Sequence, residues 1–341
     1  MASNVPRTTP SPRVRGEGRG EGQLDAKSPS PDRAARGRPL PALRGEVRYG
    51  WAVVIPYAWL IAFFLAPFLI VFKISLSETT IAQPPYLPLL DLSAGWEGLG
   101  RFLAGLSFDN YVVLGSDRLY LAAYLKSLEV AAFSTLVLLL LGYPFAYAMT
   151  RVPRRLQAIL VMLVVLPFWT SFLIRVYAWI NILQRDGLFN QVLIALGVVD
   201  QPVGWLSTNT AVYIGIVYSY FPFMVLPLFA ALEKIDVSLH EAAADLGARP
   251  VTTFWRVTVP LSRPGIIAGS LLCFIPIVGE FVIPDLLGGS ATVMIGQTLW
   301  TEFFANRDWP IASAVAVVLL CLLIVPILIY QHQQAREIES R

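Results

Sequence analysis

The sequence predicts an all-α membrane protein with six transmembrane helices, and three observations support this prediction. Of the 341 residues, 56% are hydrophobic and only 14% are charged, whereas soluble domains carry about 25% charged residues. Six apolar stretches are long enough for a helix of about 20 residues to cross a bilayer. Lys and Arg are concentrated in alternate connecting segments. An even number of spans places both termini on the same side of the membrane.

The predicted spans together form a transmembrane domain over residues 50–331. Five contain long segments without any charged residue, and the fifth span in chain order is the exception because it contains Glu280 and Asp285. The spans are expected at about residues 51–74, 125–150, 156–179, 208–232, 264–287 and 309–330.

The positive charges predict the orientation. Nineteen of the 26 Lys and Arg residues fall in the first 49 residues, in the loops after the second and fourth spans, and in the last ten residues. Positive residues mark cytoplasmic loops, so both termini are expected in the cytoplasm. Residues 1–49 are rich in Pro, Gly, Ser and Arg, and we expect a disordered tail there. Residues 332–341 form a second, short cytoplasmic tail.

Composition also excludes several classes of function. The two histidines and two cysteines are too few and too dispersed for a metal site, and the net charge of +3 is too small to suggest nucleic acid as a partner. No G-x-x-x-x-G-K-[ST] phosphate-binding loop occurs. We therefore expect no catalytic residues and no cofactor bound by this chain.

The loop of residues 233–263 is the most informative segment. Ser238 and Glu241 are spaced as a capping box that starts a helix, and three alanines favour the helix that follows. Gly247 suits the left-handed position at a helix end. Pro250 can start a second short helix, and Val259-Pro260 is expected to stop that helix before the fifth span.

The first helix of this loop has two interpretations. It could be a capped surface helix that only fills space. Alternatively, the small Ala242 and Ala243 allow close approach, and Glu241 and Asp245 place two acceptors on one face. The second interpretation predicts that the helix docks into a groove on a cytoplasmic partner.

The spacing of Glu241-Ala242-Ala243, Gly247 and Val259-Pro260 resembles the signature loop of ABC-importer permeases. Further segments resemble the polyamine branch of that family and, within it, the putrescine permease. These segments are residues 126–128, 142–147, 166–175, 278–284 and 295–296. The resemblance covers about residues 50–335.

The resemblance implies a type I ABC-importer permease fold in the bacterial inner membrane. It implies that Glu241, Ala242, Ala243, Asp245 and Gly247 belong to a coupling helix that sits in a cleft of a dimeric ATPase. That ATPase would bind ATP and Mg²⁺ and hydrolyse the nucleotide. A second permease subunit, in a heterodimer, and a periplasmic solute-binding protein would complete the importer.

The solute implied by the resemblance is a polyamine, with putrescine first. Related permeases carry iron, phosphonates, opines or amino-acid-like solutes, so these remain alternatives. A secondary transporter is a further alternative, but no internal repeat is visible in the sequence. A membrane component without a transport role, such as an assembly or sensor protein, would not need the signature loop.

Five residues are candidates for the solute pathway: Glu280, Asp285, Trp169, Tyr218 and Phe221. A charge at mid-bilayer costs roughly 3 kcal/mol on insertion scales, so Glu280 should face protein or water, where it could attract a cationic solute. Equally, Glu280 could be a structural residue paired with Arg175 or with a Ser or Thr. The aromatic rings offer weak cation–π contacts. Arg175 itself, beside Tyr177 and Trp179, is expected to anchor the third span at the membrane interface.

Overall fold

The computed structural model describes residues 50–89, 93 and 95–339. Its contacts divide the chain into residues 1–58 and 59–341. Apart from residues 50–58, the features below belong to the second unit. The predicted disordered tail of residues 1–49 lies outside the described residues. So do residues 340–341 of the predicted C-terminal tail.

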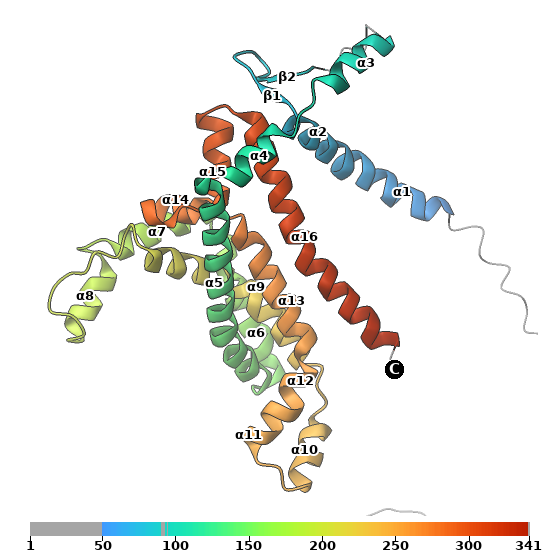
Figure 1. Ribbon diagram of the computed structural model, residues 1–341. Coiled ribbons are helices and arrows are strands. Elements are labelled where there is room, and N and C mark those ends of the chain that lie inside the picture. Colours follow the sequence, from blue (N-terminus) through green and yellow to red (C-terminus); the bar gives the residue numbers. More distant parts are fainter. Residues whose placement is uncertain (1–49, 90–92, 94, 340–341) are drawn as a thin grey trace, which may run out of the picture. The chain divides into compact units, whose positions relative to one another are not determined.

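The N-terminal helical segment and the loop before the second span come first (Figure 1). The segment consists of α1 (Gly50–Leu60), the π-helix η2 (Ile61–Leu65) and α2 (Ala66–Ser75). The strands β1 (Glu78–Thr79) and β2 (Tyr86–Leu87) then pair antiparallel. Two short helices follow, α3 (Gly95–Ala104) and α4 (Asp109–Ser116). The long loop before the second span is thus folded in part.

The middle of the chain holds the second, third and fourth apolar regions. Helix α5 (Arg118–Thr150) is the longest helix among the described residues. The third region contains α6 (Arg154–Val165), the 3₁₀ helix η4 (Leu166–Trp169) and α7 (Phe172–Leu183). The short α8 (Leu188–Ala195) precedes α9 (Asn209–Leu232).

The C-terminal third is more segmented. After α10 (Val237–Asp245), the chain forms α11 (Pro250–Thr253), the π-helix η5 (Phe254–Thr258), α12 (Val259–Leu261) and α13 (Arg263–Val278). Next come α14 (Val282–Leu287), η6 (Ser290–Thr292), α15 (Ile295–Trp300) and the π-helix η7 (Thr301–Ala305). The last helix is α16 (Trp309–Glu339), which extends beyond the predicted end of the sixth span.

The main core lies where α5, α9 and α13 pack together. Leu138, Met224 and Ile277, one from each helix, are fully buried. Glycines allow the close approach: a Cβ on Gly142 would lie 2.9 Å from Cγ of Met224, and one on Gly269 would lie 3.0 Å from its sulfur. A second cluster joins α4, α5, α15 and α16, where the Tyr124 hydroxyl donates to the Val315 carbonyl at 2.8 Å.

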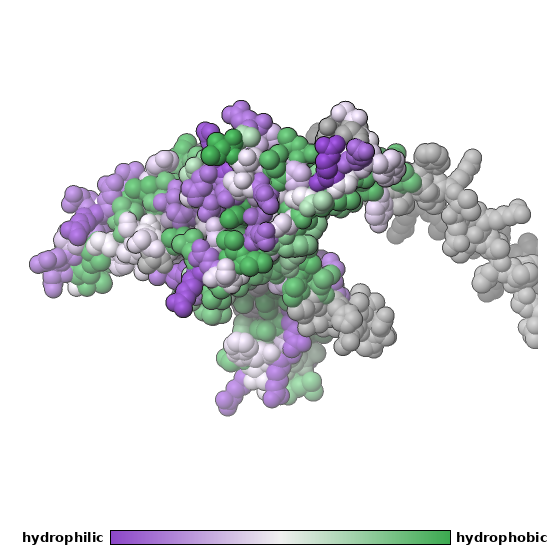
Figure 2. Space-filling view, turned by 45° about the horizontal axis from the view of Figure 1, so that its top comes forward, coloured by the Kyte–Doolittle hydropathy of each residue, from purple (hydrophilic) through white to green (hydrophobic). Residues whose placement is uncertain are grey.

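Four helical segments are long and apolar enough to cross a membrane: Val54–Ser75, Arg118–Thr150, Asn209–Leu232 and Trp309–Leu328. Two bent pairs raise the number to six if each pair is one span. The third region bends by 88° between residues 169 and 172, and the fifth begins with a 64° bend before Arg263. Large apolar side chains on these helices are exposed, and Figure 2 shows hydrophobic residues lying on the surface among hydrophilic ones. That surface suits contact with lipid.

Two of the predicted spans differ from simple helices. The predicted third span, residues 156–179, is interrupted because Thr170 is extended, with φ −96° and ψ 151°. The predicted fifth span, residues 264–287, ends early because α13 stops at Val278 and α14 starts only at Val282. Both regions carry proline close to the break, Pro167 in the third and Pro276 in the fifth, and proline removes a helical donor.

Candidate functional site

The 233–263 loop begins with a helix that is capped differently from the prediction. Helix α10 begins at Val237, and the Asp236 carboxylate accepts the amide of Ser238 at 2.9 Å. Asp is as good an N-cap as Ser, and it lies two residues earlier, so the predicted Ser238–Glu241 capping box is wrong. The amide of Ser238 lowers the pKa of the Asp236 carboxyl below its ordinary value.

The end of α10 agrees with the sequence. Gly247 has φ +77°, in the left-handed region that glycine favours. The amide of Gly247 donates to the Ala244 carbonyl at 2.8 Å, and the amide of Ala248 donates to the Ala243 carbonyl at 3.0 Å. This pair of bonds is a Schellman motif, and it turns the chain towards α11.

The second helix of the loop also begins as predicted, at Pro250. However, Val259-Pro260 does not stop it. The helical backbone continues through η5 and α12 to Leu261, and the π-helical turn η5 lies directly before Val259-Pro260, where proline removes one helical donor. The stop comes at Ser262, one residue before α13.

Aromatic contacts fix the loop to the long helix α5. The Phe254 ring packs edge-on against Tyr143 and Tyr147, with centroids 5.6 and 5.5 Å apart. The Tyr143 and Ser262 hydroxyls are 2.8 Å apart. The loop is therefore in direct contact with the helical core.

The predicted coupling residues lie on α10 and its end, at a distance from the main core (Figure 1). Glu241, Ala242, Asp245 and Gly247 are exposed, whereas Ala243 is half-buried. His240 holds α10 to η5, with its Nε2 3.1 Å from the Thr258 hydroxyl. One face of α10 is thus held by the loop, and the other presents small and acidic side chains to the surroundings.

The second candidate region is the break between α13 and α14, where Glu280 is buried with 8% of its surface exposed. The Tyr220 hydroxyl donates to one carboxylate oxygen at 2.6 Å. The amides of Val282 and Ile283 donate to the other at 3.0 and 3.4 Å. Tyr220 and backbone amides, not Arg175 and not a Ser or Thr, are the partners of this carboxylate.

Helix α15 packs closely over this break. A Cβ on Gly296 would overlap the Gly279 carbonyl oxygen and lie 2.8 Å from that of Glu280. The neighbouring amide of Ile295 donates to the Ser127 hydroxyl of α5 at 2.8 Å. The Gly279–Glu280 segment is therefore covered by α15 and bound by Tyr220 of α9.

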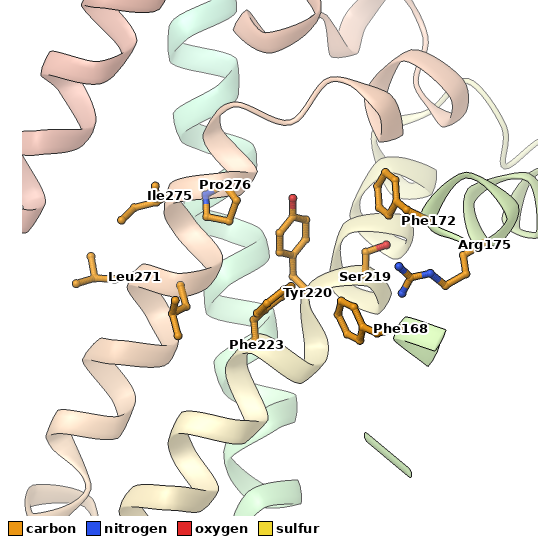
Figure 3. A pocket seen from close by; sticks show the side chains of 10 residues that line it. Phe168, Phe172, Arg175, Ser219, Tyr220, Phe223, Leu271, Ile275 and Pro276 are labelled. Atoms are coloured by element: carbon orange, nitrogen blue, oxygen red, sulfur yellow. The ribbon is translucent and has the colours of Figure 1, made fainter. Parts of the chain in front are cut away.

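Beside the break lies a cavity of about 530 Å³ between α7, α9 and α13. Figure 3 shows Tyr220 and Ser219 from α9, with the Arg175 side chain extending from α7 towards them. The Arg175 guanidinium lies 4.9 Å from the Phe168 ring centroid and 5.7 Å from that of Phe172. Its Nε is buried without a hydrogen-bond partner in the described structure. Arg175 thus lines a cavity, whereas the sequence predicts an anchor at the membrane interface.

The structure does not bring the five predicted pathway residues together. Tyr218 and Phe221 line a separate cavity of about 310 Å³, beside Phe145 and Pro222. Trp169 is 72% exposed. Asp285 is exposed and accepts a hydrogen bond from the Gln297 amide at 2.9 Å. Only Glu280 is connected to the larger cavity, through Tyr220.

Tyr220 is the residue that sequence reasoning missed. It lies two positions from Tyr218 and one from Phe221, so it projects from a different face of the same helix. An aromatic cluster in sequence cannot show which ring meets Glu280. Only a comparison of which residues lie on the facing sides of the fourth and fifth spans could have pointed to Tyr220.

A family model described as binding-protein-dependent transport system inner membrane component matches residues 138–338. The chain belongs to this family. It is therefore a multi-pass inner-membrane permease of a transport system and not an enzyme. This confirms the family predicted from the signature loop.

Relatives of the permease agree with this assignment. It is 39% identical over 289 residues to the spermidine/putrescine transport system permease protein PotB of Haemophilus influenzae, covering 85% of this chain and 94% of the relative. With PotB of Escherichia coli strain K12 it is 42% identical over 224 residues, covering 66% and 81%. These similarities confirm the predicted resemblance to the polyamine branch.

A solved structure confirms the fold. A bacterial ABC transporter involved in the import of the acidic polysaccharide alginate matches with a TM-score of 0.61, at 18% identity, over 84% of this permease and 94% of that chain. At 18% identity, this similarity is evidence for the fold only. The predicted type I importer fold is confirmed, while the cytoplasmic location of the termini stays a prediction.

Proposed function

We propose that this permease forms half of the transmembrane path of an ATP-driven importer for a polyamine, with putrescine as the first candidate and spermidine as the second. The observation that carries the proposal is the 39% identity to a spermidine/putrescine permease over 85% of this chain. That relative is named for both polyamines, so identity alone does not choose between them. Permeases for iron, phosphonates, opines or amino-acid-like solutes are the competing assignment.

The importer would need three kinds of partner. An ATPase dimer, which would hold ATP and Mg²⁺, supplies the energy, and a second permease subunit supplies the other half of the path. A periplasmic binding protein delivers the solute. A transporter of the same fold supports the proposal of a periplasmic partner: the bacterial alginate ABC transporter was solved in complex with an alginate pentasaccharide-bound periplasmic protein.

The coupling helix in this proposal is α10. Its exposed Glu241, Ala242 and Asp245 offer acceptors beside small side chains, which permit close packing in a cleft of the ATPase. Closure of the ATPase would move α10, and the Phe254 contacts with Tyr143 and Tyr147 would pass the movement to α5. The spans would then shift between inward-open and outward-open states.

The polyamine pathway would use the region around Glu280. A buried carboxylate favours a cation, and a diamine brings two ammonium groups that carboxylates and aromatic faces attract. Tyr220 places that carboxylate behind the wall of the larger cavity. Arg175 in the same cavity opposes a cation, so the path should run on the Glu280 side, or Arg175 should be neutralised by the second subunit.

The experiment is uptake of labelled putrescine and labelled spermidine by cells that express the complete importer and lack other polyamine uptake. We expect saturable uptake that requires ATP, and competition by the other polyamine but not by ferric chelates or phosphonates. Uptake without ATP, or competition by the chelates alone, would overturn the proposal.

Two matched variants test the role of α10. Ala242→Arg places a large cation on the exposed face, and we expect uptake to fall at least about tenfold with loss of ATPase binding, because an unpaired charge in an interface is strongly unfavourable. Ala195→Arg makes the same change at an exposed alanine of α8, and uptake should persist. Equal uptake by the two variants would exclude α10 as the coupling helix.

A further inference from the structure

A polar cavity of about 190 Å³ lies between the turn after α5 and the base of the 233–263 loop. Arg151, Arg154 and Gln157 contribute to one wall, and Glu233, His240 and Thr258 to the other. The cavity thus touches the start of α6, the end of α9 and the coupling-helix candidate α10. It shares no lining residue with the two cavities described above.

The charges around the cavity are unbalanced. Two arginines face one carboxylate, and within the described part of the chain neither Arg151 nor Arg154 forms an ion pair. Arg151 hydrogen-bonds the Tyr147 hydroxyl and lies 4.7 Å from the centroid of that ring. The Arg154 side chain forms no hydrogen bond among the described residues. The lining of the cavity therefore has an excess positive charge, and the Arg154 guanidinium has no partner among the described residues.

The walls are held in place without a ligand. The Gln157 side-chain amide donates to the carbonyls of Val152 at 3.0 Å and Thr150 at 3.4 Å, which fixes the turn between α5 and α6. On the opposite wall, His240 is bound to Thr258 at 3.1 Å. A ligand would find the cavity formed already, so binding would not require the loop to reorganise first.

We propose that this cavity binds a phosphate group, either free inorganic phosphate or the headgroup of an anionic phospholipid. Arginine presents a planar fork of donors that matches phosphate oxygens. A water occupies about 30 Å³ in the liquid, so the cavity of about 190 Å³ has room for a phosphate group with a few waters. The bound group would bridge the α5–α6 turn to α10, next to the Phe254 contacts that would pass movement to α5 in the proposed function.

The chain offers a matched set of variants. Arg154→Gln removes a cation that lines the cavity, and Arg155→Gln removes the exposed cation beside it, which does not line the cavity. Glu233→Gln removes the carboxylate from the wall. All three positions lie on the surface, so the folded state should tolerate each change.

The test uses the full chain, purified with its partner subunits, in a non-ionic detergent and freed of lipid. The midpoint of thermal unfolding is followed during titration with inorganic phosphate, with short-chain phosphatidylglycerol, and with diacylglycerol of the same chain length as the phosphate-free control. Ionic strength is held constant with chloride, because salt screens surface charges.

We expect saturable binding of phosphate or of phosphatidylglycerol, and the arm that binds identifies the source. Arg154→Gln should weaken that binding about tenfold, since hydrogen bonds to charged groups are the strong ones. Arg155→Gln should change it by less than about twofold, because an exposed charge outside the cavity is screened. Glu233→Gln should tighten it by removing repulsion.

Several outcomes would overturn the site. Absence of binding in both phosphate arms would do so, as would equal binding of diacylglycerol. Equal weakening by Arg154→Gln and Arg155→Gln would show that only general surface charge attracts the anion. None of these results depends on which solute the importer carries.

Discussion

At the residue scale, Tyr220 has two roles in the structure. Its ring lines the larger cavity, and its hydroxyl donates to the buried Glu280 at 2.6 Å. Removing the donor of a buried carboxylate lowers the free energy of unfolding by more than the hydrogen bond itself contributes. The reason is that the carboxylate stays buried without a partner. Tyr220 is thus the side chain that satisfies the buried Glu280 carboxylate.

Tyr220→Phe should therefore lower the free energy of unfolding by about 1–3 kcal/mol, the usual penalty for an unsatisfied buried polar group. Tyr218→Phe is the matched control, since the Tyr218 hydroxyl makes no hydrogen bond in the described structure. It should change stability by less than about 0.5 kcal/mol. Denaturant titration in detergent measures both, and equal losses would show that the hydroxyl of Tyr220 contributes nothing.

Asp236 is the second residue with a specific expectation, because it and not Ser238 caps α10. Asp236→Ala should speed hydrogen exchange in the first turn of α10, whereas Ser238→Ala should leave it unchanged. A larger effect of Ser238→Ala would show that Ser238, and not Asp236, caps α10.

The pH dependence of this cap follows from the lowered pKa of Asp236. A carboxyl with a lowered pKa stabilises the folded state above its ordinary pKa, and the contribution is lost as pH falls through the lowered value. Protection of the first turn of α10 should therefore fall at acidic pH in the wild type. In Asp236→Asn, which caps without a charge, it should not change over this range.

At the element scale, the breaks in the helices decide where polar groups can lie inside the bundle. The α13–α14 break leaves backbone amides without helical partners, and two of them donate hydrogen bonds to the Glu280 carboxylate. A membrane protein must satisfy such groups internally. Helix α15 can cover the break only because position 296 has no side chain. Close packing of α15 is thus a condition for keeping the break dry.

Gly296→Ala should destabilise the protein by about 1–3 kcal/mol, the usual result of overpacking, because the new Cβ would overlap the Gly279 carbonyl. Gly279→Ala is its control on the facing segment. There the nearest atom outside the local backbone, Cδ2 of Leu319, lies 3.8 Å from the added carbon. Thermal unfolding compares the two, and tolerance of Gly296→Ala would show that α15 does not press on the break.

At the scale of the whole molecule, the number of spans decides which side of the membrane each loop occupies. With six spans, the 233–263 loop lies on the same side as the turn between α5 and α6. If the 88° and 64° bent pairs did not cross, only four spans would remain, and the loop would lie on the opposite side from that turn.

Cysteine labelling from one side of the membrane separates these topologies. In a Cys273→Ala, Cys321→Ala background, Ala244→Cys and Arg155→Cys should react with a membrane-impermeant reagent only from the cytoplasmic side. Gly115→Cys, in α4, should react only from the outside. Labelling of Ala244→Cys from the same side as Gly115→Cys would favour four spans. Helix α10 would then lie on the outer side, where a cytoplasmic ATPase could not contact it.

The sequence by itself determined the membrane class, the apolar regions and the family. These depend on hydrophobic length, on charge distribution and on the signature loop, all of which are local properties of the chain. The helix of that loop and its left-handed end at Gly247 were also predicted, since caps and glycine conformations act within a few residues.

Only the tertiary structure decided which side chains meet. Glu280 pairs with Tyr220, which lies 60 residues away, and Arg175 lines a cavity because an 88° bend turns α7 relative to α6. The predicted pathway residues separate because Tyr218 and Tyr220 project from different faces of α9. Hydrophobic pattern sets how long a helix is, but the rotation and breaks of packed helices decide which polar groups share a site.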